Sequence, residues 1–154
     1  MLSVLFFDDY PQASENRLFR ADLLEALDCY DATVDTAKTV ADFESKMIQT
    51  QYDVVILDIM AKAPKSLAEE ESVSDSRTGL ALLERCRRGT YGNRYKEAMI
   101  YIRTARGERH IRKRAMRAGA TGYFIIGDDD ESVVPTIAEH VCRKYGSETA
   151  SGDH

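Results

Sequence analysis

A run of four apolar residues that ends in an aspartate limits the fold of this chain more than any other stretch. Val54, Val55, Ile56 and Leu57 follow one another, and Asp58 comes directly after them. Such a run is typical of a strand that is buried on both faces, as in a parallel sheet covered by helices. At the carboxyl end of that strand, Asp58 would lie in the crevice where open α/β sheets bind ligands. The alternative role for Asp58 is a helix cap or a solvated loop residue.

Strand and helix patterns alternate along the rest of the chain. The predicted strands are residues 2–7, 32–34, 54–57, 98–104 and 123–126. The predicted helices lie within residues 11–28, 39–48, 80–89, 109–118 and 128–146. Five strands that alternate with five helices predict an α/β fold with a doubly wound parallel sheet and a single domain.

Apolar residues recur at helical spacing in these helices, and polar residues or glycines mark their ends. The expected buried faces of the first two helices consist of Leu18, Phe19, Leu23, Ala26 and Leu27, and of Val40, Phe43, Met47 and Ile48. The expected end signals are Thr39 as an N-cap, Gly89 in a left-handed cap, Asp128 to Asp130 as caps of the last helix, and Gly146 as its stop.

The segment between the third strand and the third helix departs from this regular pattern. Residues 59–77 contain a proline, several serines and the acidic run Glu69 to Glu71, with little periodicity. Loops of this length are usually functional or disordered. We therefore expect a domain over residues 1–146 with an inserted, flexible acidic loop over residues 59–77, and a disordered tail over residues 147–154.

Composition excludes several classes of protein. The chain has 154 residues and a net charge of −5, so it does not bind polyanions by bulk charge. No apolar run is long enough to span a bilayer, and the first residues lack the basic segment and cleavage site of a signal peptide. The three cysteines are widely spaced and lack metal-ligand spacing. We expect a cytoplasmic protein without membrane contact.

Carboxylates and a hydroxyl follow three of the predicted strands. Asp8 and Asp9 follow the first strand, Asp58 follows the third, and Thr104 ends the fourth. If the first and third strands are neighbours, three carboxylates converge, and their repulsion favours an oxygen-ligand site for a hard cation, with Mg²⁺ the best fit. A carboxylate beside such a cation can attack phosphorus, and the Thr104 hydroxyl can donate to a phosphoryl oxygen.

Together these segments resemble the receiver domain of two-component response regulators over residues 2–145. The resemblance is carried by Asp8-Asp9, by residues 52–58, by Thr104-Ala105 and by residues 118–123, in this order. It implies the flavodoxin-like strand order 2-1-3-4-5.

The resemblance also implies roles for individual residues. Asp58 would be the phosphoacceptor, Asp9 a direct Mg²⁺ ligand, and Asp8 a ligand that acts mainly through water. The backbone carbonyl of Met60 would be the third protein ligand. Two further residues complete the set: Thr104 would contact the phosphoryl group and Tyr123 would be the aromatic switch.

Two features depart from the family pattern. Ile126 stands where receivers carry a lysine at the end of the fifth strand, and Gly79 lies 21 positions after Asp58, about twice the usual distance. A lysine there pairs with the phosphoryl group as a point charge, which isoleucine cannot do. The substitution predicts inefficient phosphorylation of Asp58 and a weak response of Tyr123.

The basic residues are concentrated in one part of the chain. Residues 85–117 hold 12 of the 21 lysines and arginines. A solvated helix face is the default interpretation, and docking of an acidic protein to the fourth helix is the sharper one. Stacking aromatics and a recognition motif are missing, so nucleic acid is not favoured. By resemblance, the upstream partner would be a sensor histidine kinase or a phosphotransfer protein, and a homodimer is left open.

Three functions remain after these arguments. The first is a receiver that is phosphorylated on Asp58 and relays the signal through protein contacts, with no enzyme activity beyond its own phosphotransfer and dephosphorylation. The second is a pseudo-receiver, an interaction module that phosphorylation does not switch. The third is a metal-dependent phosphatase or other hydrolase, against which stands the lack of a catalytic Ser, Cys or His constellation.

Overall fold

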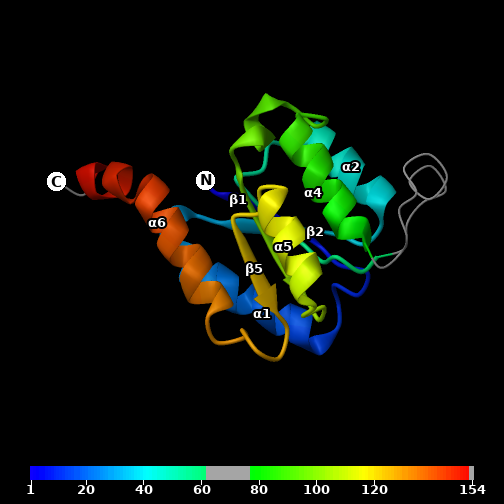
Figure 1. The fold of residues 1–154 in the computed structure, drawn as a ribbon. Helices are drawn as coiled ribbons and strands as arrows, with labels where there is room; N and C mark the ends of the chain where they lie inside the picture. The colour runs from blue at the N-terminus through cyan, green and yellow to red at the C-terminus, as the bar shows by residue number, and fades with distance from the viewer. Residues whose placement is uncertain (62–76, 153–154) are drawn as a thin grey trace.

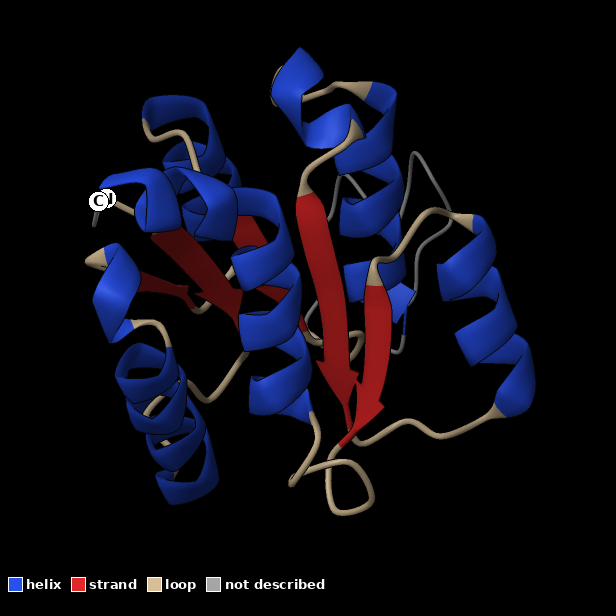
Figure 2. Ribbon diagram, turned by 90° about the vertical axis from the view of Figure 1, so that its left-hand side faces the viewer, coloured by secondary structure: helices blue, strands red, loops and turns tan. Residues whose placement is uncertain are grey.

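The protein forms a five-stranded parallel sheet between two layers of helices (Figures 1 and 2). The computed structural model describes residues 1–61 and 77–152, with side chains described up to residue 146. The strands are β1 (Ser3–Phe7), β2 (Thr33–Ala37), β3 (Val54–Leu57), β4 (Met99–Thr104) and β5 (Gly122–Ile125). Their order in the sheet, β2-β1-β3-β4-β5, confirms the predicted flavodoxin-like topology.

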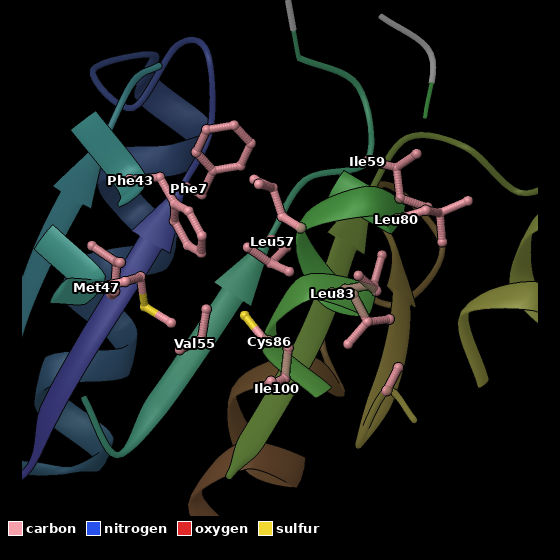
Figure 3. Close-up of a cluster of buried hydrophobic side chains, with 14 of the residues drawn as sticks. Phe7, Phe43, Met47, Val55, Leu57, Ile59, Leu80, Leu83, Cys86 and Ile100 are labelled. Carbon is pink, nitrogen blue, oxygen red and sulfur yellow. The ribbon is translucent and has the colours of Figure 1, made fainter. Parts of the chain in front are cut away.

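Two clusters of apolar side chains, one on each face of the sheet, hold the helices in place. On one face pack α1 (Ser14–Ala26) and α6 (Val133–Gly152), and on the other α2 (Val40–Gln49), α4 (Thr78–Arg88) and α5 (Arg109–Arg117). The second face is drawn in Figure 3, where Phe7 and Phe43 lie together and Leu57 lies between them and Leu83. Neighbouring residues of a strand point to opposite faces, so Phe6 packs with the α1 and α6 cluster.

Short 3₁₀ turns complete the described structure. They are η1 (Asp28–Tyr30), which follows α1, and η3 (Asn93–Lys96), which precedes β4. No helix among the described residues is long and apolar enough to cross a membrane.

The buried helix faces are narrower than the sequence indicated. In α1 the residues toward the sheet are Asn16, Phe19 and Leu23, whereas Leu18 is 63% exposed and Ala26 is also at the surface. In α2, Ile48 is 73% exposed beside the buried Met47. Consecutive helical residues are rotated by about 100°, so only one member of each apolar pair can face the sheet.

Two of the expected helix ends are confirmed. The Thr39 hydroxyl accepts a hydrogen bond from the Asp42 backbone N–H at 3.1 Å, as an N-cap does. Gly89 ends α4 with φ of 85°, in the left-handed conformation that favours glycine.

The expected end at Gly146 and the expected caps of the last helix are wrong. Helix α6 continues to Gly152, because one glycine costs a helix interior only about 1 kcal/mol and Ile137 and Val141 anchor the preceding turns. The carboxylates of Asp129 and Asp130 accept hydrogen bonds from the backbone N–H groups of Ile125 and Gly127, at 2.7 and 3.0 Å. They close the turn after β5 instead of capping α6.

The start of α4 is joined to the end of β3 by backbone contact. The Gly79 N–H donates to the Ile59 carbonyl at 2.9 Å, and the Thr78 hydroxyl donates to the Ala61 carbonyl at 2.5 Å. Residues 62–76 of the predicted acidic loop lie outside the described residues. The described residues on either side of this segment are therefore held together next to Asp58.

Replacement of Gly79 by alanine should destabilise the fold. A Cβ atom at this position would lie 2.1 Å from the Asp58 carbonyl oxygen, so the backbone would have to shift. We expect Gly79→Ala to lower the free energy of unfolding by about 1–3 kcal/mol in urea denaturation. Gly107→Ala is the matched control, since its Cβ would lie 3.4 Å from Ile125 at ordinary contact distance. Equal midpoints for the two variants would contradict this.

Candidate functional site

The carboxyl ends of β1, β3 and β4 form the candidate site. Because β3 pairs with both β1 and β4, the residues after these strands lie at one edge of the sheet. Asp8 is 4% exposed and Thr104 is fully buried, while Asp58 is half-buried. Asp8 and Asp58 line a cavity of about 240 Å³. Its other lining residues are Tyr10, Ala13, Glu15, Asn16, Met60, Ala105 and Ile126.

The electrostatics of the site centre on Asp58. Burial, and next the negative charge of Asp8, raise the pKa of Asp58 to about 7. Hydrogen bonds from the Met60 backbone N–H, at 3.1 Å from Oδ1, and from the Thr104 hydroxyl act in the opposite direction. The fold thus places two carboxylates where both cannot be ionised without cost, and it turns two donors toward one of them.

The structure brings Asp8 and Asp58 together at the cavity. Asp9, the third predicted carboxylate, is half-buried. Among the side chains that the structure describes, in residues 1–61 and 77–146, no group of three or more His, Cys, Asp or Glu is placed to hold a metal ion.

The donors that are present nevertheless suit Mg²⁺. This ion takes one or two protein carboxylates and completes its shell with water and phosphate oxygens. Asp8 and Asp58 supply such a pair beside a cavity. A divalent cation there would offset the burial of the Asp58 carboxylate and its repulsion by Asp8, which together raise the pKa of Asp58. Asp9 and the Met60 carbonyl remain predicted ligands.

The loop after β4 connects Thr104 to Tyr123. The Tyr123 hydroxyl donates to the Arg106 carbonyl at 2.6 Å, and the Arg106 N–H donates to the Thr104 hydroxyl oxygen at 3.3 Å. Tyr123 is 4% exposed, and burial raises its pKa to about 12, so its hydroxyl stays a donor. A change at Thr104 can therefore reach Tyr123 through one short loop.

Ile126 lines the cavity where a cation was expected, and two arginines lie nearby in the sequence. Arg106 forms an ion pair with Glu108 at 2.8 Å. Arg103 points away from the Thr104 side, because neighbouring residues of a strand face opposite sides of the sheet, and it lies over the Phe19 ring at 4.3 Å.

Sequence reasoning missed Asn16 as a residue of the site. Asn16 is 3% exposed and lines the cavity. It occupies the buried face of α1, three positions before Phe19 and seven before Leu23. An asparagine in an otherwise apolar helical stripe is the signal that could have identified it.

Solved structures similar to this one are receiver domains. A CheY-like response regulator receiver domain from Methanospirillum hungatei is 15% identical, with a TM-score of 0.62, and the match covers 96% of this chain and 98% of that one. The signal receiver domain of a DNA-binding response regulator from Colwellia psychrerythraea is 17% identical, with a TM-score of 0.66 and coverages of 92% and 98%.

A third similar structure contains a modified site. It is a response regulator from Burkholderia pseudomallei with a phosphorylated aspartic acid, a calcium ion and citrate, 18% identical, with a TM-score of 0.57 and coverages of 96% and 75%. No protein-family model and no curated protein matches the chain. The comparisons establish that the chain has the fold of response-regulator receiver domains.

We expect the metal-free protein to lose stability as the pH rises through the raised pKa of Asp58. The pKa is about 7 in the folded chain, against an ordinary value of 3.8, so the folded state holds this proton more tightly than the unfolded state. Its contribution is complete below the ordinary value and is lost as the pH rises through about 7. Asp58→Asn cannot ionise, so at about pH 8 it should be more stable than wild type by on the order of 2 kcal/mol.

Urea denaturation in the presence of a chelator measures this difference at alkaline and at mildly acidic pH, where it should shrink. Asp128→Asn is the control, since Asp128 is exposed. An Asp58→Asn variant that gains nothing over wild type at alkaline pH would show that neither burial nor Asp8 raises the pKa of Asp58.

Proposed function

We propose that this chain is a signalling receiver that accepts a phosphoryl group on Asp58. The observation that carries the proposal is the placement of the Asp58 carboxylate at the end of β3, at a cavity and beside Asp8 and the Thr104 hydroxyl. The similar Burkholderia protein, which carries a phosphorylated aspartic acid on the same fold, supports it.

The proposed chemistry is phosphotransfer to a carboxylate. An Asp58 oxygen attacks the phosphorus of a phosphohistidine on a sensor kinase or phosphotransfer protein. The bond from this oxygen to phosphorus forms, the nitrogen–phosphorus bond breaks, and its electron pair stays on the donor imidazole. A Mg²⁺ ion held by Asp8, Asp9, Asp58 and the Met60 carbonyl would offset the negative charge of the phosphoryl oxygens. The Thr104 hydroxyl, now directed at Asp58, would then donate to a phosphoryl oxygen.

The proposed output is a protein contact through α5. Arg109, Arg112, Lys113 and Arg117 are exposed on this helix, which suits an acidic partner. The Arg112 guanidinium lies 5.7 Å from the centre of the Tyr123 ring. Movement of Tyr123 would therefore alter the basic surface directly.

A pseudo-receiver is the second candidate, and Ile126 is the observation that favours it. The cavity has an apolar side chain at the position of the expected lysine. A modification shifts a conformational equilibrium only through interactions that differ between the two states, and one such interaction is missing here.

Intact mass after treatment with a small phosphodonor tests the proposed function. We expect one phosphoryl group per chain in the presence of Mg²⁺, little without it, and none in Asp58→Asn. The exposed Asp128→Asn variant is the control and should be modified like wild type. Failure to modify wild type would favour the pseudo-receiver, and turnover of a separate substrate would favour a hydrolase.

The switch is expected to be weak because of Ile126. Ile126→Lys should speed modification roughly tenfold, as expected for one added charge contact worth about 1.4 kcal/mol. It should also enlarge the beryllofluoride-induced NMR shifts at Thr104 and Tyr123. Met116→Lys adds the same charge at a 46% exposed position on α5 and should change neither. Large shifts already present in wild type, with no gain in the lysine variant, would show an intact switch.

A further inference from the structure

Arg103 is an unusual residue for the interior of this fold. It lies in β4, is 4% exposed, and is the only buried basic residue among residues 1–61 and 77–146. Its guanidinium packs against Phe19, and more distantly against Phe6 at 5.9 Å. A buried charge requires compensating partners, since the loss of water around it is costly.

A chain of hydrogen bonds joins Arg103 to the acidic site. Arg103 Nη1 donates to Asn16 Oδ1 at 2.7 Å, and Asn16 Nδ2 donates to the Tyr10 carbonyl at 2.8 Å. The Tyr10 backbone N–H in turn donates to Asp8 Oδ1 at 2.8 Å. Each residue in this chain of hydrogen bonds donates to the next one, and the last donor bonds to Asp8. Arg103 therefore holds Asn16 and Tyr10, which fix the Asp8 carboxylate.

The position of Arg103 also places its charge beside the strand end where the lysine is missing. Arg103, Glu15 and Ile126 line a second cavity of about 150 Å³, and the last two residues also line the cavity of Asp8 and Asp58. Burial lowers the pKa of Arg103, whereas Asp8 and then Asp130 are the leading charges that oppose this. The positive charge of Arg103 therefore interacts with the carboxylates of the acidic site.

We propose that Arg103 is a positioning residue that gives the Asp58 site the positive charge that Ile126 does not supply. This inference rests on the proposed function. Arg103 acts through Asn16 and Tyr10 on Asp8, and its charge lowers the cost of adding an anion next to the two carboxylates. Removal of this charge should have opposite effects on the two ligands of the site, because a cation there repels Mg²⁺ and attracts a phosphoryl group.

The test compares two affinities in Arg103→Gln, which is neutral but can still donate to Asn16. We expect Mg²⁺ alone to bind about three- to tenfold more tightly than in wild type, and beryllofluoride at saturating Mg²⁺ to bind about three- to tenfold more weakly. Arg103→Lys keeps the charge and should stay close to wild type. Adding Ile126→Lys to Arg103→Gln should restore beryllofluoride binding. Both affinities are measured by NMR titration.

Arg94→Gln is the matched control, because Arg94 is paired with Asp53 at the opposite end of β3 and should leave both affinities unchanged. If Arg103→Gln fails to fold, Arg103→Met provides the test, since an unbranched apolar side chain keeps the packing on Phe19 and Phe6, removes the charge, and should move the two affinities in the same opposite directions.

The outcomes separate this inference from the proposed function. Two affinities that fall together would assign Arg103 a merely structural role, and two unchanged affinities would show that its charge does not reach the site. Either result overturns the inference while wild type still binds both ligands. Wild type that binds neither Mg²⁺ nor beryllofluoride would overturn the proposed function and the inference together.

Discussion

The repulsion between two carboxylates at the edge of the sheet is the constraint on which the rest of the site depends. β1 and β3 are paired in register, so the residues that follow them cannot avoid each other, and Asp8 is almost fully buried. The fold accommodates this by partial protonation, which the raised pKa of Asp58 expresses, and by donors from Met60 and Thr104. Two ionised carboxylates at this site cost free energy, and binding of a cation or loss of one charge lowers that cost. Such an arrangement suits a site that depends on a ligand.

Much of the fold could be predicted because its signals are local and repeated. The run from Val54 to Leu57 identifies a strand buried on both faces, and the strand–helix alternation leaves few topologies. Asp8, Asp58 and Thr104 could be placed together because parallel strands end at one edge. The helix boundaries were less predictable: Gly146 is tolerated inside α6 because packing of the earlier turns outweighs its low propensity. Leu18 and Ile48 were misassigned because two adjacent apolar residues share a stripe in sequence but not a face in space.

The remaining errors concern side-chain direction, which sequence spacing does not determine. Asp129 and Asp130 were expected to cap the last helix, but the turn after β5 brings the backbone N–H groups of Ile125 and Gly127 within hydrogen-bond distance of their carboxylates. Asn16 and Arg103 are separated by 87 positions and meet only because α1 packs on the sheet face toward which Arg103 points, so neither residue alone indicates the pair.

The end of β4 separates two sets of contacts around the site. Arg103 and Thr104 are neighbours in the strand and therefore point to opposite sides of the sheet. Arg103 faces α1 and holds the residues that fix Asp8, whereas Thr104 contacts Asp58 and the loop that binds Tyr123. Tyr123 packs in the same cluster as Ile111 and Ala115 of α5, beneath the basic surface of that helix. A change of charge at Asp58 therefore acts on two sets of contacts. On one face of the sheet are Arg103, Asn16 and Asp8, and on the other is the hydrogen-bonded loop after Thr104. Arg103, Asn16 and Asp8 are buried, whereas the loop after Thr104 is exposed at Ala105. A structural change at Asp58 should therefore move this loop, which contacts Tyr123 next to α5.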